Sequence, residues 1–260
     1  GDFDAGAPRA YSRAFADKAA QKEGDTPAKM KRLGKEVNDM HRRTKLPCHA
    51  SAAIFLRHDA DRLDKMRVVL TGPEGTPYEG GCFVFDLFFP GGYPNVPPLM
   101  VLQTTGEGRM RFNPNLYADG KVCLSLLGTW HGGHESEKWD PAHSSVFQIV
   151  MSIQSQIMVE DPYFNEPNVE AMRKTSEGAA HSASYNAELQ LGNVRWAMLD
   201  VLRHPPPGFE DVVKNHFRLL RHRLMATTTR WVAAAGAAGA TMQRRLDGAV
   251  CELHAALAAL

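Results

Sequence analysis

Residues 113–130 read Asn-Pro-Asn-Leu-Tyr-Ala-Asp-Gly-Lys-Val-Cys-Leu-Ser-Leu-Leu-Gly-Thr-Trp and carry the strongest signals in the chain. Pro114 restricts its own φ and favours an extended residue before it, so Asn115 is presented from a stiff turn. The Asp-Gly pair at 119–120 is a strong turn signal that returns the chain, and we therefore expect Cys123 to lie near Asn115. A thiol beside an amide donor suits acyl transfer, because the amide can donate to the oxyanion that forms at a carbonyl under attack.

Two interpretations of Cys123 compete. A single cysteine in an apolar run is most often a small buried hydrophobe. The whole string, however, resembles the active-site segment of ubiquitin-conjugating enzymes (E2 enzymes), in which a His-Pro-Asn turn precedes the cysteine that forms a thioester. Asn115 stands eight positions before Cys123, the interval found in that family, while Asn113 takes the place of the His and could hold the turn by bonding to backbone. The string from 121 to 130 is most similar to the large-E2 subgroup, which includes an inhibitor-of-apoptosis hybrid and the E2/E3 hybrids.

Length and composition describe an ordinary globular protein. The 260 residues can bury one sizeable core plus an extension, and 43% are hydrophobic and 23% charged. A net charge of +1 gives no electrostatic reason to expect a nucleic-acid partner. Arg218, Arg221 and Arg223 follow a helical period without interleaved aromatic residues, which predicts a solvated face and no nucleic-acid surface.

The cysteines and histidines form no metal-site pattern. Four cysteines are scattered along the chain without a Cys-x-x-Cys pair, which favours free thiols in a reducing compartment. His131, His134 and His143 follow Cys123, but their spacing is poor for zinc, so we expect neither a metal nor another cofactor. No apolar run approaches the ~18 residues of a membrane span, and no signal segment begins the chain. We therefore expect no membrane partner and a cytoplasmic location, with the nucleus as the alternative.

The N-terminal part predicts an arm followed by a helix. Residues 1–26 are rich in Ala, Gly and charge without a sustained period, which predicts a flexible or partly helical arm. Ala28–Met40 has apolar residues at helical spacing and a basic polar side. By itself a basic face of this kind is a solvated surface. The resemblance to the first helix of E2 enzymes instead implies that Lys31, Arg32 and Lys35 contact the ubiquitin-activating enzyme (E1).

Four strands and their short connections predict the fold class. The alternation of Phe83, Phe85, Leu87 and Phe89 indicates a strand with one buried face. The expected strands are Ile54–Arg57, Lys65–Leu70, Phe83–Phe89 and Leu99–Leu102. Short loops between them predict an antiparallel meander. We therefore expect an α+β protein whose E2 core, residues 27–170, has an N-terminal helix on a four-stranded antiparallel meander followed by helices.

Three further features of the sequence bear on the active-site segment. Many E2 enzymes have an aromatic or apolar residue after Tyr-Pro, and RING-type ligases bind it. Here that position is Asn95, whose smaller apolar area should weaken this anchoring by about 1–2 kcal/mol of transfer free energy. Residues His131–Lys138 read as an insertion, either a solvated loop or a segment that controls acceptor access. Ser144–Val159 has the period of a core helix, with Ser144 as the expected N-cap.

The Pro-rich loop Glu160–Pro167 follows this helix. The resemblance implies that it faces Cys123 and borders the incoming lysine. We expect Glu166 to orient the amine and receive its proton, and Tyr163 to help desolvate it. A surface turn with capping carboxylates is the alternative.

A helical extension is predicted over residues 171–260. Leu189–Leu202 and Phe209–Trp231 have helical periods, separated by three prolines and a glycine. The Ala-rich residues 233–260 predict a weakly packed helix or a docking arm. Because the chain opens on Gly1, we expect a processed product or a piece of a larger protein, whose remainder then counts among the partners.

The resemblance implies a function with two acyl transfers. Cys123 would accept ubiquitin from E1 as a thioester, and a lysine of a protein substrate would then take it from Cys123. ATP would be consumed by the upstream E1, so ubiquitin, E1 and protein substrates are the expected partners. The alternatives are a catalytically silent E2-variant module that binds ubiquitin and a scaffold piece of a larger chain. Asn115 and Cys123 are both present, which argues against a silent variant.

Overall fold

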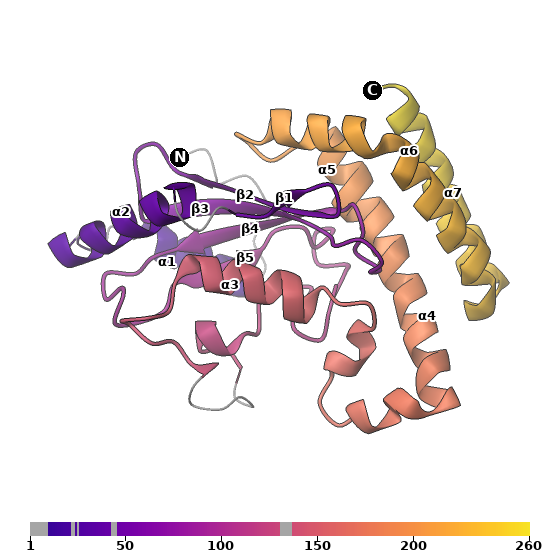
Figure 1. Ribbon diagram of the computed structural model, residues 1–260, viewed down its shortest axis with the longest axis horizontal. Coiled ribbons are helices and arrows are strands. Elements are labelled where there is room, and N and C mark those ends of the chain that lie inside the picture. Colours follow the sequence, from indigo (N-terminus) through magenta and orange to yellow (C-terminus); the bar gives the residue numbers. More distant parts are fainter. Residues whose placement is uncertain (1–9, 22–23, 25, 43–45, 131–136) are drawn as a thin grey trace.

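A five-stranded antiparallel sheet forms the centre of the computed structural model (Figure 1). The structure describes residues 10–21, 24, 26–42, 46–130 and 137–260. The strands follow one another in meander order: β1 (Cys48–His49), β2 (Ala52–His58), β3 (Lys65–Thr71), β4 (Cys82–Phe88) and β5 (Leu99–Leu102). The predicted α+β fold with an antiparallel meander is confirmed. The sequence prediction missed β1, whose two residues are too few to show a period.

Seven α-helices surround the sheet in the described part of the chain. Their bounds are α1 (Ala10–Ala20), α2 (Pro27–Arg42), α3 (Val146–Ser152), α4 (Ser176–Gly192), α5 (Val201–Arg203), α6 (Glu210–Ala234) and α7 (Ala240–Ala258). A π-helical segment, Ile153–Ile157, continues α3, and another, Asn193–Asp200, joins α4 to α5. No helix among the residues described combines the length and apolar character that crossing a bilayer requires.

One face of the sheet packs against α2 and α3 (Figure 1). Phe83, Phe85 and Leu87 of β4 lie in this core, opposite Leu70, Val68 and Met66 of β3 in the strand register. The predicted apolar face of β4 is therefore confirmed. The predicted face of the helix after residue 144 is confirmed as well, since the same core contains the buried apolar residues Val146, Ile149, Val150, Ile153 and Ile157.

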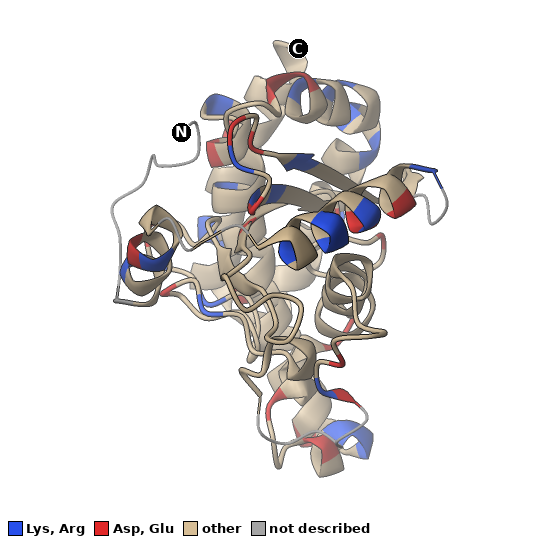
Figure 2. Ribbon diagram, turned by 90° about the vertical axis from the view of Figure 1, so that its left-hand side faces the viewer, with Lys and Arg blue, Asp and Glu red and all other residues tan. Residues whose placement is uncertain are grey.

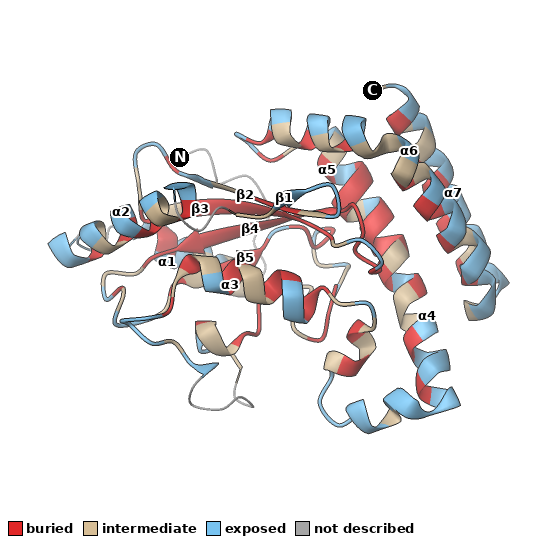
Figure 3. Cartoon of the chain, in the orientation of Figure 1, coloured by how far each residue is buried: buried red, intermediate tan, exposed pale blue. Residues whose placement is uncertain are grey.

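The other face of the sheet forms a second core with α4 to α7. Cys82 and Val84 of β4 are buried there, so β4 is buried along its whole length (Figure 3). The prediction of one buried face was wrong, because the C-terminal helices cover the side that alternation had assigned to solvent. The expected weak packing of residues 233–260 was also wrong, since Leu246, Leu253 and Leu257 of α7 are fully buried. The division of the chain at residue 170 stays a prediction.

Local contacts at helix ends correct one further detail. The N-cap of α3 is Ser145, not the predicted Ser144: Ser145 Oγ accepts from Gln148 N, and Gln148 Oε1 accepts from Ser145 N at 3.0 Å. This is a reciprocal capping box, which the Gln three residues on makes possible. Ser144 is buried, and its hydroxyl accepts from Asp140 N at 2.9 Å.

Candidate active site

Asn115 and Cys123 lie side by side, as the turn signals predicted. Cys123 N donates to Asn115 O at 2.8 Å, and Asn115 Nδ2 donates to Cys123 O at 3.0 Å. The return between them is made by Gly120, whose φ of 89° suits glycine, and by Asp119, whose carboxylate accepts from Lys121 N at 3.0 Å. In this arrangement the Asn115 amide binds the backbone of the very residue whose thiol would carry the acyl group.

Asn113 holds the turn from below. Its side chain is fully buried and donates to Tyr78 Oη at 2.9 Å and to Ile157 O at 2.8 Å. Its Oδ1 accepts from Asn115 N at 2.9 Å. An amide can therefore fix this turn through buried hydrogen bonds where the E2 pattern has a His, and two of the partners are backbone groups, as expected from the sequence.

The Cys123 thiol is almost covered, with 3% of the residue exposed. Burial raises the pKa of this thiol, and the nearby cations Lys121 and Arg111 and a hydrogen bond with Tyr117 offset only part of that increase. Helix α1 lies near this segment: Ser12 Oγ donates to Asp119 O, and the Cys123 charge contributes to raising the pKa of the Tyr11 phenol, after burial of that phenol.

Glu166 reaches the active-site segment through Arg111. Arg111 Nη2 lies 3.3 Å from Glu166 Oε2, and the same guanidinium donates to Pro114 O at 2.8 Å. Both side chains of this pair are close to half exposed. The structure therefore places Glu166 beside the Asn-Pro-Asn turn, at a surface where a substrate side chain could approach.

Tyr163 lies on the short 3-10 helix Pro162–Asn165 and packs against α4. Its ring stacks on His181 with 5.9 Å between centroids and an interplanar angle of 10°, and it also contacts Tyr185. Helix α4 holds the same loop through Ser182 Oγ, which donates to Asp161 Oδ1 at 2.7 Å. The loop that carries Tyr163 and Glu166 is thus braced by the C-terminal extension.

Sequence reasoning missed three residues of this site: Arg111, Tyr117 and Lys121. Tyr117 and Lys121 lie within the quoted segment, but a tyrosine and a lysine between two turns have no signal of their own. Arg111 precedes the segment, and its role depends on the 160–166 loop folding back against the turn, which a single sequence does not reveal.

Comparison with known proteins now assigns the family. A family model described as "Ubiquitin-conjugating enzyme" matches residues 32–190. The chain belongs to the ubiquitin-conjugating enzyme family. The Dual E2 ubiquitin-conjugating enzyme/E3 ubiquitin-protein ligase BIRC6 of Mus musculus is 48% identical over 211 residues, which cover 81% of this chain and 4% of that protein. Probable ubiquitin-conjugating enzyme protein 17 of Caenorhabditis elegans is 43% identical over 202 residues, 78% of this chain and 27% of that protein.

A viral protein is also similar to this chain. Probable ubiquitin-conjugating enzyme E2 R521 of Acanthamoeba polyphaga mimivirus is 43% identical over 187 residues, 72% of this chain and 13% of that protein. The chain therefore spans between 4% and 27% of the length of these three relatives. The predicted resemblance to the E2/E3 hybrids within the ubiquitin-conjugating enzyme family is confirmed.

The three basic residues of α2 that were expected to contact E1 have different surroundings in this ubiquitin-conjugating enzyme. Lys31 and Lys35 are exposed, and Lys and Arg recur along α2 in the view of Figure 2. Arg32 is instead held within the molecule, where it donates to Glu36 Oε1 at 2.7 Å, to Pro141 O at 2.9 Å and to Ser144 O. Contact of all three residues with E1 stays a prediction, but only the two lysines present free charge to solvent.

The predicted insertion and its neighbours are partly described. Residues 131–136, with His131 and His134, lie outside the described residues. Trp139, just after them, donates from Nε1 to Pro94 O at 2.7 Å. Asn95, next to that proline, is exposed, as is Val96 with 43% of its surface accessible.

Among the residues described, no group of three or more His, Cys, Asp or Glu could hold a metal ion.

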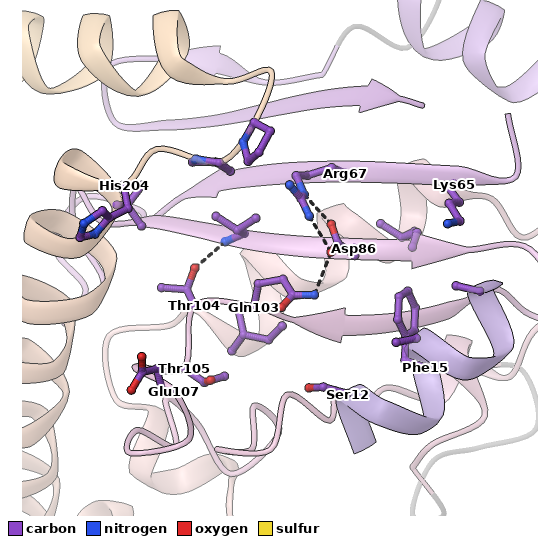
Figure 4. A pocket seen from close by; sticks show the side chains of 18 of the residues that line it. Ser12, Phe15, Lys65, Arg67, Asp86, Gln103, Thr104, Thr105, Glu107 and His204 are labelled. Carbon is purple, nitrogen blue, oxygen red and sulfur yellow. Dashed lines mark hydrogen bonds and ion pairs between the residues drawn. The ribbon is translucent and has the colours of Figure 1, made fainter. Parts of the chain in front are cut away.

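A groove of about 730 Å³ lies elsewhere, on the β3–β5 face between α1 and the Pro-rich loop after α5 (Figure 4). Its floor contains Arg67 and Asp86, joined at 2.6 Å, and Gln103, whose amide donates to Asp86 at 2.8 Å. Cys123 does not line this groove. The groove is therefore not part of the candidate active site of this ubiquitin-conjugating enzyme.

Proposed function

We propose that this chain is an active ubiquitin-conjugating enzyme that carries ubiquitin on Cys123. In the first step the Cys123 thiolate attacks the thioester carbonyl of ubiquitin on E1, and the E1 thiolate leaves. In the second step the amine of a substrate lysine attacks the Cys123 thioester, the C–S bond breaks, and an isopeptide bond forms. ATP is consumed by E1, so this chain needs no cofactor of its own.

The pairing of Asn115 with Cys123 is the observation that supports this proposal most. The Asn115 amide lies 3.0 Å from the Cys123 carbonyl oxygen, and in this proposal it turns to donate to the oxyanion formed at the sulfur-bound carbonyl. Until then it keeps the loop in shape. Asn115 thus serves both the resting loop and the transition state in this proposal.

The second step requires a neutral lysine. With an ordinary pKa of about 10.4, only a few molecules in ten thousand are neutral at pH 7. Desolvation against the ring of Tyr163 lowers that pKa, whereas a carboxylate alone would raise it. We therefore assign Glu166 to orienting the amine and receiving its proton during attack.

The near-complete burial of Cys123, with 3% of the residue exposed, favours one alternative, a catalytically silent E2 variant that binds ubiquitin. A charging assay with E1, ATP and ubiquitin separates the two. The proposal expects a reducible band that is lost in Cys123→Ala and becomes resistant to reductant, as an oxyester, in Cys123→Ser. No band in the wild-type chain would leave the binding module as the function.

Selection of the substrate by the protein itself is the finer part of the proposal. The name of the mouse relative describes a dual E2/E3 enzyme. The exposed Asn95 offers a RING-type ligase little apolar area at the place where the family commonly has it. We therefore expect transfer from charged enzyme to a native substrate without a separate ligase. An absolute requirement for an added RING ligase would contradict this.

A further inference from the structure

Arg111 lies where the two loops of the candidate active site meet. Its Nε donates to Asn113 O at 3.2 Å and its Nη2 to Pro114 O at 2.8 Å, so both donors hold the backbone of the Asn-Pro-Asn turn. The same Nη2 lies 3.3 Å from Glu166 Oε2 on the opposite loop. An ion pair this exposed adds little to stability, so its effect is to be sought in orientation.

The guanidinium also stacks on Tyr117. Its central carbon lies 4.4 Å from the ring centroid, a close cation–π contact, and the Tyr117 side chain in turn hydrogen-bonds the Cys123 thiol. One cation therefore connects the proton acceptor proposed for lysine with the ring that contacts the nucleophile.

We propose that Arg111 is a positioning residue, which holds the Glu166 carboxylate at the mouth of the site and, through Tyr117, places a positive charge that favours the thiolate of Cys123. This inference rests on the proposed function. In lysine discharge the attacking amine gives its proton to Glu166, and the C–S bond breaks to release Cys123 as a thiolate. Arg111 assists at both ends, because it orients the proton acceptor and stabilises the departing negative charge.

Other charged and titratable groups act on the same thiol. The groups facing Cys123 are Tyr11 from α1, Arg111 before the turn, and Tyr117, Asp119 and Lys121 within the active-site segment. Lys121 acts in the same direction as Arg111, and Asp119 in the opposite direction. Among the residues that the structure describes, removing Arg111 leaves the cation Lys121 in place, so the effect on the thiol should be partial.

The first test is the pH profile of Cys123 alkylation by iodoacetamide, followed by peptide mass spectrometry so that the exposed Cys48 and Cys251 do not interfere. It needs neither E1 nor ubiquitin. We expect Arg111→Met to move the inflection upward by roughly half a pH unit. Arg111→Lys, which keeps the charge, should restore most of the shift. Tyr117→Phe should shift the profile in the same direction as Arg111→Met.

Arg109→Met is the matched control. Arg109 is also paired with a glutamate, Glu107, at 3.0 Å, and also stacks on an aromatic ring, that of Trp196. It should leave the alkylation profile unchanged. Equal profiles for Arg111→Met, Arg109→Met and the wild type, with all three folded by circular dichroism, would overturn the inference. That result would say nothing against charging at Cys123, and a failed charging assay would leave the profile readable.

The second test is single-turnover discharge of charged enzyme to free lysine. We expect Arg111→Met to slow discharge by between about tenfold and 100-fold. Glu166→Gln should slow it as well, and the double variant should be no slower than the worse single variant, because the two residues act as a unit. Additive losses in the double variant would show that Arg111 does not work through Glu166.

Discussion

Ser12 Oγ donates to the carbonyl oxygen of Asp119 at 2.9 Å, across 107 positions of sequence, and this bond seats α1 on the turn that precedes Cys123. Tyr11 beside it donates to Met100 O at 3.2 Å. Helix α1 is thus a structural neighbour of the segment that carries the candidate nucleophile.

Removing α1 should expose the thiol. We expect deletion of residues 1–24 to raise the rate of Cys123 alkylation at fixed pH severalfold, because Tyr11 and Ser12 no longer cover the segment. Ser12→Ala, which removes only one hydrogen bond, should give a smaller increase. An unchanged rate in the deletion variant would mean that the segment from 113 to 130 covers the thiol by itself.

Asn115→Ala should separate the two acyl transfers. The variant should still accept ubiquitin from E1, while discharge to lysine slows by about 100-fold or more through loss of an oxyanion donor. Charging and discharge rates measured on the same preparation provide the check. Equal loss in both steps would instead mean that the loop had collapsed once the bond to Cys123 O was gone.

The Asp64 carboxylate should make the free energy of unfolding decrease at low pH. Burial by itself would raise the pKa of this carboxyl, but two hydrogen bonds from Arg62 and the charge of Lys29 outweigh it and hold the pKa below 3.8. A depressed folded pKa stabilises the protein above the unfolded value of 3.8, and this contribution is lost as the pH falls through the folded pKa.

Asp64→Asn should therefore lower the free energy of unfolding at pH 7. It should also make that free energy decrease less steeply as the pH falls below 5, because the protonation of Asp64 no longer contributes to the decrease. Urea melts at a series of pH values measure both effects. The exposed Asp61 provides the control, since Asp61→Asn should leave the curve near that of the wild type. A parallel acid limb in Asp64→Asn and the wild type would contradict the assignment.

Gly81→Ala should destabilise the attachment of the extension. A Cβ at residue 81 would lie 1.9 Å from Asn193 Oδ1 and 2.9 Å from Ala197 Cβ, so the helix after α4 must shift. We expect a loss of about 2 kcal/mol or more in the free energy of unfolding. Gly34→Ala in α2, where no described atom apart from its chain neighbours and the backbone of its own helix lies within 4 Å of the added Cβ, should instead gain about 0.5–1 kcal/mol.

Short sequence patterns predicted the strands and turns themselves better than they predicted what packs against them. The period of Phe83, Phe85 and Leu87 identified β4 and its core face, and the Asp-Gly pair at 119–120 predicted the return that brings Asn115 to Cys123. Both depend on neighbours in sequence. The second buried face of β4 depends on helices more than 90 residues further along, so alternation alone assigned it to solvent.

Arg111, one of the three site residues that the sequence did not reveal, follows the same rule. The partners of Arg111 are two carbonyls nearby and a carboxylate 55 positions away, and only the folded chain brings them to one guanidinium. Ser144 was the expected N-cap, but the period of α3 does not fix its first residue; the reciprocal bonds with Gln148 show that the N-cap is Ser145.

The two-sided burial of β4 has a consequence for protein engineering. A chimera that joined the first 170 residues to an unrelated partner would expose the apolar side chains of Val69 and Val84 to solvent on one face of the sheet. Exposed apolar patches of this kind promote aggregation. A domain exchange between members of this family should therefore transfer the sheet and the C-terminal helices α4 to α7 together.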